Sequence, residues 1–361
     1  MVFYEDSNPS RMDADPVEHH VQCKILSIAK CLRAGSGAGR PHNNSETSIR
    51  PIGLVIPTYN RIDTLLVCLQ HLEAQSWKDF EVVVVDDGST DATPHKMEQY
   101  QRRAPFPFQY LRQSNSGPAT ARNRAIRELD TTVCLLLGDD IFASTDLVRI
   151  HWEHHRDHPA LDAAAVGLTR WSERGQLVTP FMKWLDRDGA QFAYGDLIGG
   201  VTPSWKHFYT SNLSLKTEQL RLNPFDERFR KAAMEDIELG YRLTVQNELA
   251  MSFLPTAVAE HLHPTSFRQA CRRMLGLGSS AYLLGEIWPE FRMASPSPLK
   301  LKLRAVLQHD WILARLTDAA DIWTEHQVPN PLMKKVLSLH STLGYRQAAE
   351  RENLTAHKPS A

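Results

Sequence analysis

From residue 51 onward, short apolar runs alternate with longer stretches in which apolar residues recur at helical spacing. Four of the runs have the length of strands: 52–56, 81–85, 108–111 and 133–137. The second is an almost continuous β-branched run, as expected for a strand whose two faces are both covered by helices. The stretch after the first run places Leu65 and Leu69 on the same helix face. This alternation predicts an α/β fold in which helices flank a mostly parallel sheet.

The same pattern divides the chain into three parts. Residues 1–50 are polar, are interrupted by Gly35, Gly37, Gly39 and Pro41, and contain one helix-like run at 21–32, so we expect a flexible N-terminal extension. A main domain over residues 51–290 and a helical C-terminal extension over residues 291–361 follow. Later elements of the main domain show the same two periods: a strand near 163–169 and helices at 146–158, 235–246 and 266–284.

The charge of the chain narrows the classes of partner. Lysine and arginine together number 41 and aspartate and glutamate 42, which gives a formal net charge of −1. A general nucleic-acid binder needs a basic excess to displace counterions from phosphate. We therefore expect no nucleic-acid partner.

Cysteine usage and hydropathy bear on the compartment. The five cysteines are scattered and form no CxxC pair, which favours a reducing environment. The first 20 residues lack the basic end and apolar run of a signal peptide, and no stretch is apolar enough to cross a membrane. We expect a cytoplasmic protein, with peripheral attachment to the cytoplasmic face of a membrane left open, as is the oligomeric state.

Acidic residues follow two of the predicted strands, with Asp86 and Asp87 after the second and Asp139 and Asp140 after the fourth. Ligands of open α/β sheets bind beyond the carboxyl ends of the strands, so these acids should meet in one crevice. The chain has no GxxxxGK[ST] loop, and a divalent cation held by carboxylates is the obvious substitute for neutralising nucleotide phosphates. The alternative is that Asp86 and Asp87 only cap a helix and that Asp139 and Asp140 are an ordinary acidic pair at a turn.

Six motifs occur in an order that resembles glycosyltransferase family 2: IGLVIPTYNR at 52–61, VVVVDDGSTD at 82–91, NSGPATARNRA at 115–125, LLLGDD at 135–140, TSNLSLK at 210–216 and FDERFRKAAMEDIELGYRL at 225–243. The resemblance covers roughly residues 51–284. It implies a GT-A fold, a Rossmann-like open sheet flanked by helices. It also implies inverting transfer of a sugar from a nucleoside diphosphate sugar to a hydroxyl of a glycan, a lipid-linked acceptor or a small molecule.

The resemblance also implies which residues bind the donor nucleotide. They are Pro57, Tyr59, Asp86, Asp87, Arg122 and Asp139. Tyr59 could stack on a flat base, and a carboxylate can accept a base N–H. For Arg122 a surface role is an alternative.

The implied metal ligand is Asp140, with Mn²⁺ or Mg²⁺ as the cofactor. Gly138 stands where the family often has its first acid, which weakens any division of labour between Asp139 and Asp140. His261 is favoured slightly over His263 as a further metal ligand, and a purely structural histidine is the alternative.

For the acceptor side, the resemblance implies that Asp236 is the general base. Glu235, Asn212 and Trp205 are assigned to the acceptor side, although Asn212 could pack beneath the site and Trp205 could belong to the core. A helix N-terminus stabilised by two acids is the structural alternative for Glu235 and Asp236.

Two other clusters have less specific interpretations. Four histidines have helical spacing, which we interpret as an ordinary exposed helix rather than a zinc site: His151, His154, His155 and His158. Three arginines on the helix at 266–284 could face a diphosphate, an anionic lipid surface or solvent: Arg268, Arg272 and Arg273. The amphipathic segment after residue 298 could pack on the main domain or lie on a membrane.

Two other functions stay open at this stage. A nucleotidyltransferase would use a similar sheet and acid-bound magnesium, but PTYNR stands where its glycine-rich phosphate loop would be. A catalytically silent sugar-nucleotide binding protein would keep the fold, and the retained Glu235-Asp236 pair argues against it.

Overall fold

The computed structural model describes residues 50–187, 192–293, 303–304, 306–322 and 331–356. Contacts divide the chain into units Met1–Ser48 and Ile49–Ala361, and all described residues lie in the second unit. The predicted N-terminal helix at 21–32 and the first part of the amphipathic segment after residue 298 lie outside the described residues.

One eight-stranded sheet has the strand order β3-β2-β1-β4-β7-β6-β8-β5. Its strands are β1 (Arg50–Thr58), β2 (Phe80–Asp86), β3 (Phe108–Arg112), β4 (Thr131–Leu137), β5 (Ile141–Ala143), β6 (Ala163–Trp171), β7 (Asn212–Lys216) and β8 (Ala250–His261). The four strands predicted from apolar runs form the parallel half, β3-β2-β1-β4. In the other half, β7 runs antiparallel to β4 and β6, β5 runs antiparallel to β8, and only β6 and β8 are parallel. The sheet is therefore mixed rather than mostly parallel.

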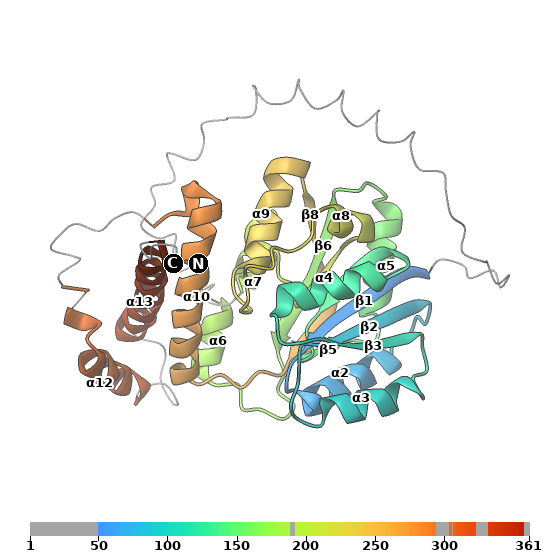
Figure 1. Cartoon of the computed structure of the whole chain (residues 1–361). Helices are drawn as coiled ribbons and strands as arrows, with labels where there is room; N and C mark the ends of the chain where they lie inside the picture. Colours follow the sequence, from blue (N-terminus) through green and yellow to red (C-terminus); the bar gives the residue numbers. More distant parts are fainter. Residues whose placement is uncertain (1–49, 188–191, 294–302, 305, 323–330, 357–361) are drawn as a thin grey trace, which may run out of the picture. The chain divides into compact units, whose positions relative to one another are not determined.

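Helices follow the strands on both faces of this sheet (Figure 1). They are α2 (Ile62–Glu73), α3 (Thr93–Gln101), α4 (Pro118–Glu128), α5 (Leu147–Asp157), α6 (Pro180–Arg187), α7 (Tyr194–Ile198), α8 (Thr217–Leu222), α9 (Glu235–Asn247), α10 (Phe267–Ile287), α12 (Asp310–Asp321) and α13 (Pro331–Ala356). Two short 3₁₀ helices are η5 (Trp205–His207) and η6 (Pro289–Phe291). None of the helices in the described part of the chain combines the length and apolar character that crossing a bilayer requires.

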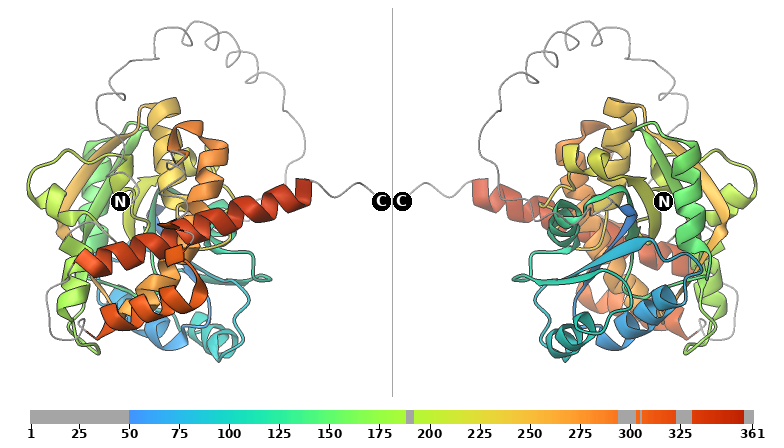
Figure 2. Two further views of the ribbon diagram at one scale, coloured as in Figure 1. Left: turned by 90° about the vertical axis from the view of Figure 1, so that its left-hand side faces the viewer. Right: turned by 90° about the vertical axis from the view of Figure 1, so that its right-hand side faces the viewer.

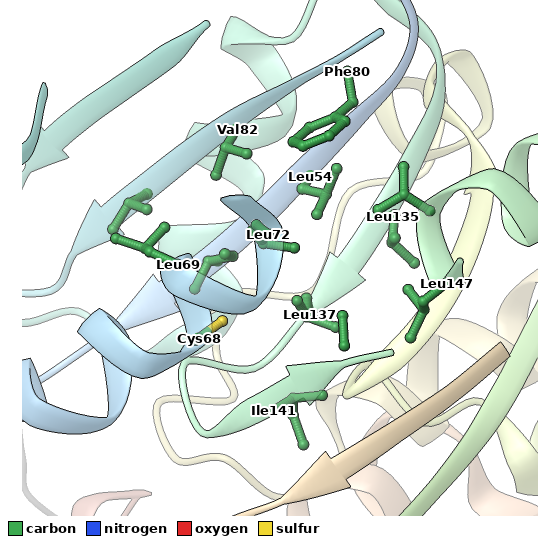
Figure 3. Packing of buried hydrophobic residues seen from close by; sticks show 14 of the residues in the cluster. Leu54, Cys68, Leu69, Leu72, Phe80, Val82, Leu135, Leu137, Ile141 and Leu147 are labelled. Carbon is green, nitrogen blue, oxygen red and sulfur yellow. The ribbon is translucent and has the colours of Figure 1, made fainter. Parts of the chain in front are cut away.

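Two hydrophobic clusters, one on each face, explain why the central strands are apolar throughout. Leu54 of β1 packs with Leu69 and Leu72 of α2 and with Phe80 of β2 in the first cluster (Figure 3). The next residue of β1, Val55, belongs to the second cluster, which α4, α8 and α9 cover. Successive side chains of a strand point to opposite faces, so a strand covered on both sides needs a continuous apolar run.

Helix α5 differs from its predicted environment. His151 and His155 are fully buried, and Ser214 Oγ lies 2.7 Å from His151 Nδ1 and 2.8 Å from His155 Nε2. Burial lowers the pKa of His151 to about 4 and that of His155 to about 2. The interpretation of α5 as an ordinary exposed helix is therefore wrong for this face, because two neutral imidazoles pack against β7.

The C-terminal helices cross at glycines. Helices α10 and α13 lie against each other (Figure 1, Figure 2), and a Cβ added to Gly278 would lie 1.9 Å from the carbonyl oxygen of Ser341. A Cβ added to Gly344 would lie 1.9 Å from the carbonyl oxygen of Leu275. The crossing therefore brings the two backbones into direct contact, and α12 joins it through ion pairs from Arg268.

Candidate functional site

The carboxyl ends of β1, β2 and β4 meet, as the sequence pattern predicts. Thr58 Oγ1, at the end of β1, donates a 2.8 Å hydrogen bond to Asp139 Oδ2, just after β4. The backbone amide of Asp87, just after β2, donates to the carbonyl oxygen of Thr58 at 2.9 Å. The side chain of Asn60 accepts from the amides of Thr90 and Asp91 at 2.7 and 3.2 Å. Three motifs that are far apart in the sequence thus form one locus.

Asp86 has internal partners for its whole carboxylate. It is fully buried and accepts hydrogen bonds from the amide of Ser89 and the hydroxyl of Tyr110, both at 2.7 Å. A donor nucleotide has no open path to a side chain with no exposed surface. The predicted donor contact of Asp86 is therefore corrected to a structural role in the turn after β2.

Asp87 orders the loop that leads into α4. Its carboxylate accepts from Gln113 Nε2 and from the amides of Ser116 and Gly117, each at 2.8 Å. Gly117 has a φ of 97°, and a Cβ there would lie 2.6 Å from the carbonyl oxygen of Arg230, so both conformation and space require glycine. The nucleotide role of Asp87 stays a prediction, and the geometry gives it loop contacts first.

Tyr59 and Pro57 differ in accessibility at the end of β1. The side chain of Tyr59 is 46% exposed, so a face of its ring is open to a flat ligand, whereas Pro57 is half-buried within β1. Stacking of a base on Tyr59 is compatible with this exposure.

A carboxylate and two imidazoles meet beside these strand ends. Asp140 Oδ2 lies 3.4 Å from His261 Nε2 and 3.4 Å from His263 Nδ1, and one ligand atom from each residue falls within 4.8 Å of the others. Pairing of β5 with β8 places Ile141 opposite His261, and the amide of Leu262 donates to the carbonyl oxygen of Asp140 at 2.9 Å. Backbone pairing therefore sets the position of all three side chains.

The residues of this group fit a divalent cation. One carboxylate oxygen and two imidazole nitrogens are a donor set that Mn²⁺ and its heavier neighbours accept. Burial acts to raise the pKa of Asp140, but His261, His263 and Arg61 outweigh it and hold that pKa well below the usual range. The carboxylate is thus ready to coordinate without first losing a proton.

Asp139 behaves differently from its neighbour. Burial and the charge of Asp140 raise the pKa of Asp139 to about 7. Its two oxygens accept hydrogen bonds from Thr58 at 2.8 Å and from Arg61 at 3.2 Å. Asp139 therefore faces inward, and only a small part of it is open to a ligand.

Asp236 lies in the first turn of α9, next to a buried ion pair. Met234, which precedes the pair of acids, adopts a left-handed conformation with a φ of 69°. Glu235 is buried and forms a 2.9 Å ion pair with Arg122, so the alternative of a solvated Arg122 is excluded. Burial and the neighbouring charge of Glu235 raise the pKa of Asp236 to about 7.

Arg273 of α10 interacts electrostatically with both Asp140 and Asp236. Its side chain is reached by solvent, and the protein atoms around its guanidinium lower its pKa. The charges of Asp236, Glu235 and Asp140 all act on it in the opposite direction. Of the three arginines on this helix, Arg268 instead pairs with Asp318 and Asp321 of α12.

Two predicted acceptor residues have partners inside the protein. Asn212 is fully buried, donates to the carbonyl oxygen of Ala257 at 2.9 Å and lies 2.9 Å from His151 Nε2. Its assignment to the acceptor side is corrected to a structural one, because both ends of its amide are used within the core. Trp205 is half-buried and meets Tyr241 and Phe291 edge-on, with ring centroids 5.4 Å away in each case. An acceptor role for Trp205 stays a prediction.

Arg61 gains an importance that the sequence pattern did not give it, and His263 gains as much as the slightly favoured His261. Arg61, the last residue of the PTYNR motif, contacts both Asp139 and Asp140. His263 lies as close to Asp140 as His261 does, and the two rings stack with their centroids 5.3 Å apart. The available signal for Arg61 was a basic residue shortly after a strand whose neighbouring strands end in acids.

Comparisons with known proteins show which proteins the chain is similar to. A family model described as Glycosyl transferase family 2 matches residues 54–185. The chain is 26% identical over 235 residues to the uncharacterized glycosyltransferase YfnE of Bacillus subtilis (strain 168), which covers 53% of this chain and 59% of that protein. It is 28% identical over 225 residues to validoxylamine A glucosyltransferase of Streptomyces hygroscopicus subsp. jinggangensis, which covers 53% of this chain and 51% of that protein.

The chain thus spans between half and three fifths of the length of these two relatives. Among solved structures, it is similar to a mannosyltransferase from Pyrobaculum calidifontis in complex with GDP-Man and Mn²⁺. The TM-score is 0.51 at 19% identity, and the match covers 86% of this chain and 89% of that chain. The segment 54–185, which contains the ends of β1, β2 and β4, therefore matches the model of glycosyl transferase family 2, and the sheet around it has a GT-A-like fold.

Proposed function

We propose that this chain is a metal-dependent, inverting glycosyltransferase that moves one sugar from a nucleoside diphosphate sugar to an acceptor hydroxyl. One observation carries the proposal: Asp236 and Asp140, the carboxylate that lies 3.4 Å from His261 and His263, both act on the guanidinium of Arg273. A proton acceptor and a cation site thus lie in one electrostatic neighbourhood, which a transfer between a diphosphate donor and a hydroxyl needs.

Asp140, His261 and His263 would hold the divalent cation. When bound, the cation supplies positive charge that stabilises the diphosphate as it leaves the sugar. Two imidazole ligands favour Mn²⁺ over Mg²⁺, because Mg²⁺ prefers an all-oxygen shell. The pairing of β5 with β8 keeps these ligands at their positions before any donor arrives.

The donor would lie between the exposed ring of Tyr59 and the guanidinium of Arg273. Within the described ranges of the chain, Arg273 forms no ion pair with a carboxylate, so its charge is available to the donor's diphosphate. Tyr59 offers a ring face to the base. Asp139 would contact the ribose or the sugar.

Asp236 would take the proton of the acceptor hydroxyl. A single in-line displacement needs the base and the leaving group on opposite sides of the reacting carbon, and it inverts that carbon. A pKa of about 7 suits a general base at neutral pH, because the carboxylate is ionised yet basic enough to accept a proton. The ion pair of Glu235 with Arg122 would hold the start of α9 and so position Asp236.

The direct test screens nucleotide sugars for release of nucleoside diphosphate with Mn²⁺, with Mg²⁺ and with EDTA. We expect turnover with one donor, its loss with EDTA, and a fall of at least a hundredfold in Asp236→Asn. Glu218→Gln is the matched control, since Glu218 is also an acid in the first turn of a helix, is exposed, and follows Lys216, which pairs near the amino end of β4, away from the site. Release of pyrophosphate instead would indicate a nucleotidyltransferase, and donor binding without turnover would indicate a silent binding protein.

A further inference from the structure

Arg61 holds the acids at the end of β4. It follows Asn60, whose φ of 53° turns the chain sharply after β1. Nη1 of Arg61 lies 2.5 Å from Asp140 Oδ2 and 3.2 Å from Asp139 Oδ1. The side chain of Arg61 is nevertheless 40% exposed, so it can leave these acids without unpacking the core.

The oxygen that Arg61 holds is the one that faces both histidines. Asp140 Oδ2 is also the atom that lies 3.4 Å from His261 Nε2 and from His263 Nδ1. It is therefore the carboxylate oxygen that the group would present to a cation. A guanidinium and a divalent cation that share one oxygen repel each other strongly, because both positive charges then lie within about 5 Å.

We propose that Arg61 competes with the divalent cation for Asp140 Oδ2, so that the cation binds only as Arg61 releases this oxygen. This inference rests on the proposed function only in that Asp140, His261 and His263 bind a cation. Arg61 keeps the two adjacent carboxylates compensated and at the same time lowers the affinity of the site for free metal. Arg61 therefore sets the fraction of the site that metal occupies.

The test measures the affinity of the full-length chain for Mn²⁺ in the absence of donor, from the loss of the electron paramagnetic resonance signal of free Mn²⁺. We expect Arg61→Ala and Arg61→Gln to bind Mn²⁺ at least tenfold more tightly than the unmodified chain. Arg61→Lys keeps a positive charge without the planar fork. Its affinity for Mn²⁺ should therefore lie between that of the unmodified chain and those of the two neutral variants. Arg112→Ala is the matched control, because Arg112 is also an exposed strand-end arginine but pairs with Asp86.

The outcomes separate this inference from the proposed function. Tighter binding in both neutral variants, abolished by adding Asp140→Asn, supports the competition. Equal or weaker Mn²⁺ binding in Arg61→Ala and Arg61→Gln overturns the competition. If that binding is still lost in Asp140→Asn, the cation site itself is supported. If neither the unmodified chain nor the neutral variants bind Mn²⁺, the cation site and the competition are both wrong. Circular dichroism of each variant shows whether it is folded, and Arg61→Gln preserves the test if Arg61→Ala is not.

Discussion

Individual carboxylates in this site differ through their neighbours. Asp86 and Asp87 are adjacent in the sequence, yet the turn uses all of Asp86, while Asp87 holds the loop before α4. The sequence identified the acids because strand ends and acidic pairs are local features. It did not separate structural from functional ones, since that depends on which amides and hydroxyls the chain brings back to each oxygen.

The pH dependence of transfer should report Asp236. Only its ionised form accepts a proton, so with a pKa near 7 we expect kcat/KM to fall about tenfold per pH unit below that value. The charges near it are Glu235, which raises this pKa, Arg122, which lowers it, and the guanidinium of Arg273. Glu235→Gln removes the negative neighbour, and the acid limb should therefore move to lower pH.

The measurement is the pH profile of kcat/KM at saturating metal for the unmodified chain and for Glu235→Gln. Glu218→Gln again serves as the control, because Glu218 follows Lys216 near the amino end of β4, away from the site. A limb that stays at the same pH in Glu235→Gln would show that another group controls the rate.

At the scale of helices, backbone contacts and buried imidazoles decide how the elements pack. Helical spacing predicted α5, α9 and α10 to within a few residues, because amphipathic periodicity is a property of a single segment. The same spacing did not reveal that two histidines of α5 face β7, since imidazoles read as polar in a sequence. Their burial depends on Ser214, which lies 59 residues from His155.

The crossing of α10 and α13 should tolerate no side chain at its glycines. Gly278→Ala places a methyl group 1.9 Å from a backbone oxygen, so the helices must separate, and we expect a loss of about 1–3 kcal/mol in the free energy of unfolding. Gly276→Ala is the control in the same helix, where the nearest atom to a new Cβ is a lysine side-chain carbon 3.7 Å away. That variant should be neutral or slightly more stable, because alanine favours helix more than glycine does. Urea denaturation of both variants measures the difference, and equal stabilities would contradict a close crossing.

The buried imidazoles of α5 should make the protein sensitive to acid. His155 has a folded-state pKa of about 2, against about 6.5 for an ordinary histidine, so below pH 6.5 the unfolded chain takes a proton that the folded chain refuses. Stability contributed by this neutral imidazole is present above pH 6.5 and is lost progressively as the pH falls towards 2. His155→Gln removes this dependence on pH. Between pH 7 and pH 5 the free energy of unfolding of the unmodified chain should therefore fall by about 2 kcal/mol more than that of His155→Gln. Urea denaturation of both proteins at pH 7 and at pH 5 measures the difference between their free energies of unfolding. A difference that does not change with pH would show that His155 is protonated in the folded state.

For the whole molecule, the order of the strands explains what the sequence could and could not predict. The parallel half followed from apolar runs, and with it the meeting of the motifs after β1, β2 and β4. In the other half only β6 was predicted as a strand, because β5 has only three residues and β8 is partly polar. That half carries His261 and His263 to Asp140 across about 120 residues of sequence, a contact that only the pairing of β5 with β8 creates.

Cation binding should therefore stabilise the whole sheet rather than one loop. The three ligands connect the end of β4 with the end of β8, so a cation that binds only the folded chain adds about 2.7 kcal/mol at a free concentration one hundred times its Kd. We expect Mn²⁺ to raise the Tm of the unmodified chain by a few degrees, and Mg²⁺ to raise it less at the same concentration. Asp140→Asn and His261→Ala should each abolish the Mn²⁺ shift. His95→Ala, which changes an exposed histidine of α3, should keep it. A shift of the same size in Asp140→Asn would mean that the ion binds elsewhere, because no other residue of the group can supply the carboxylate that joins β4 to β8.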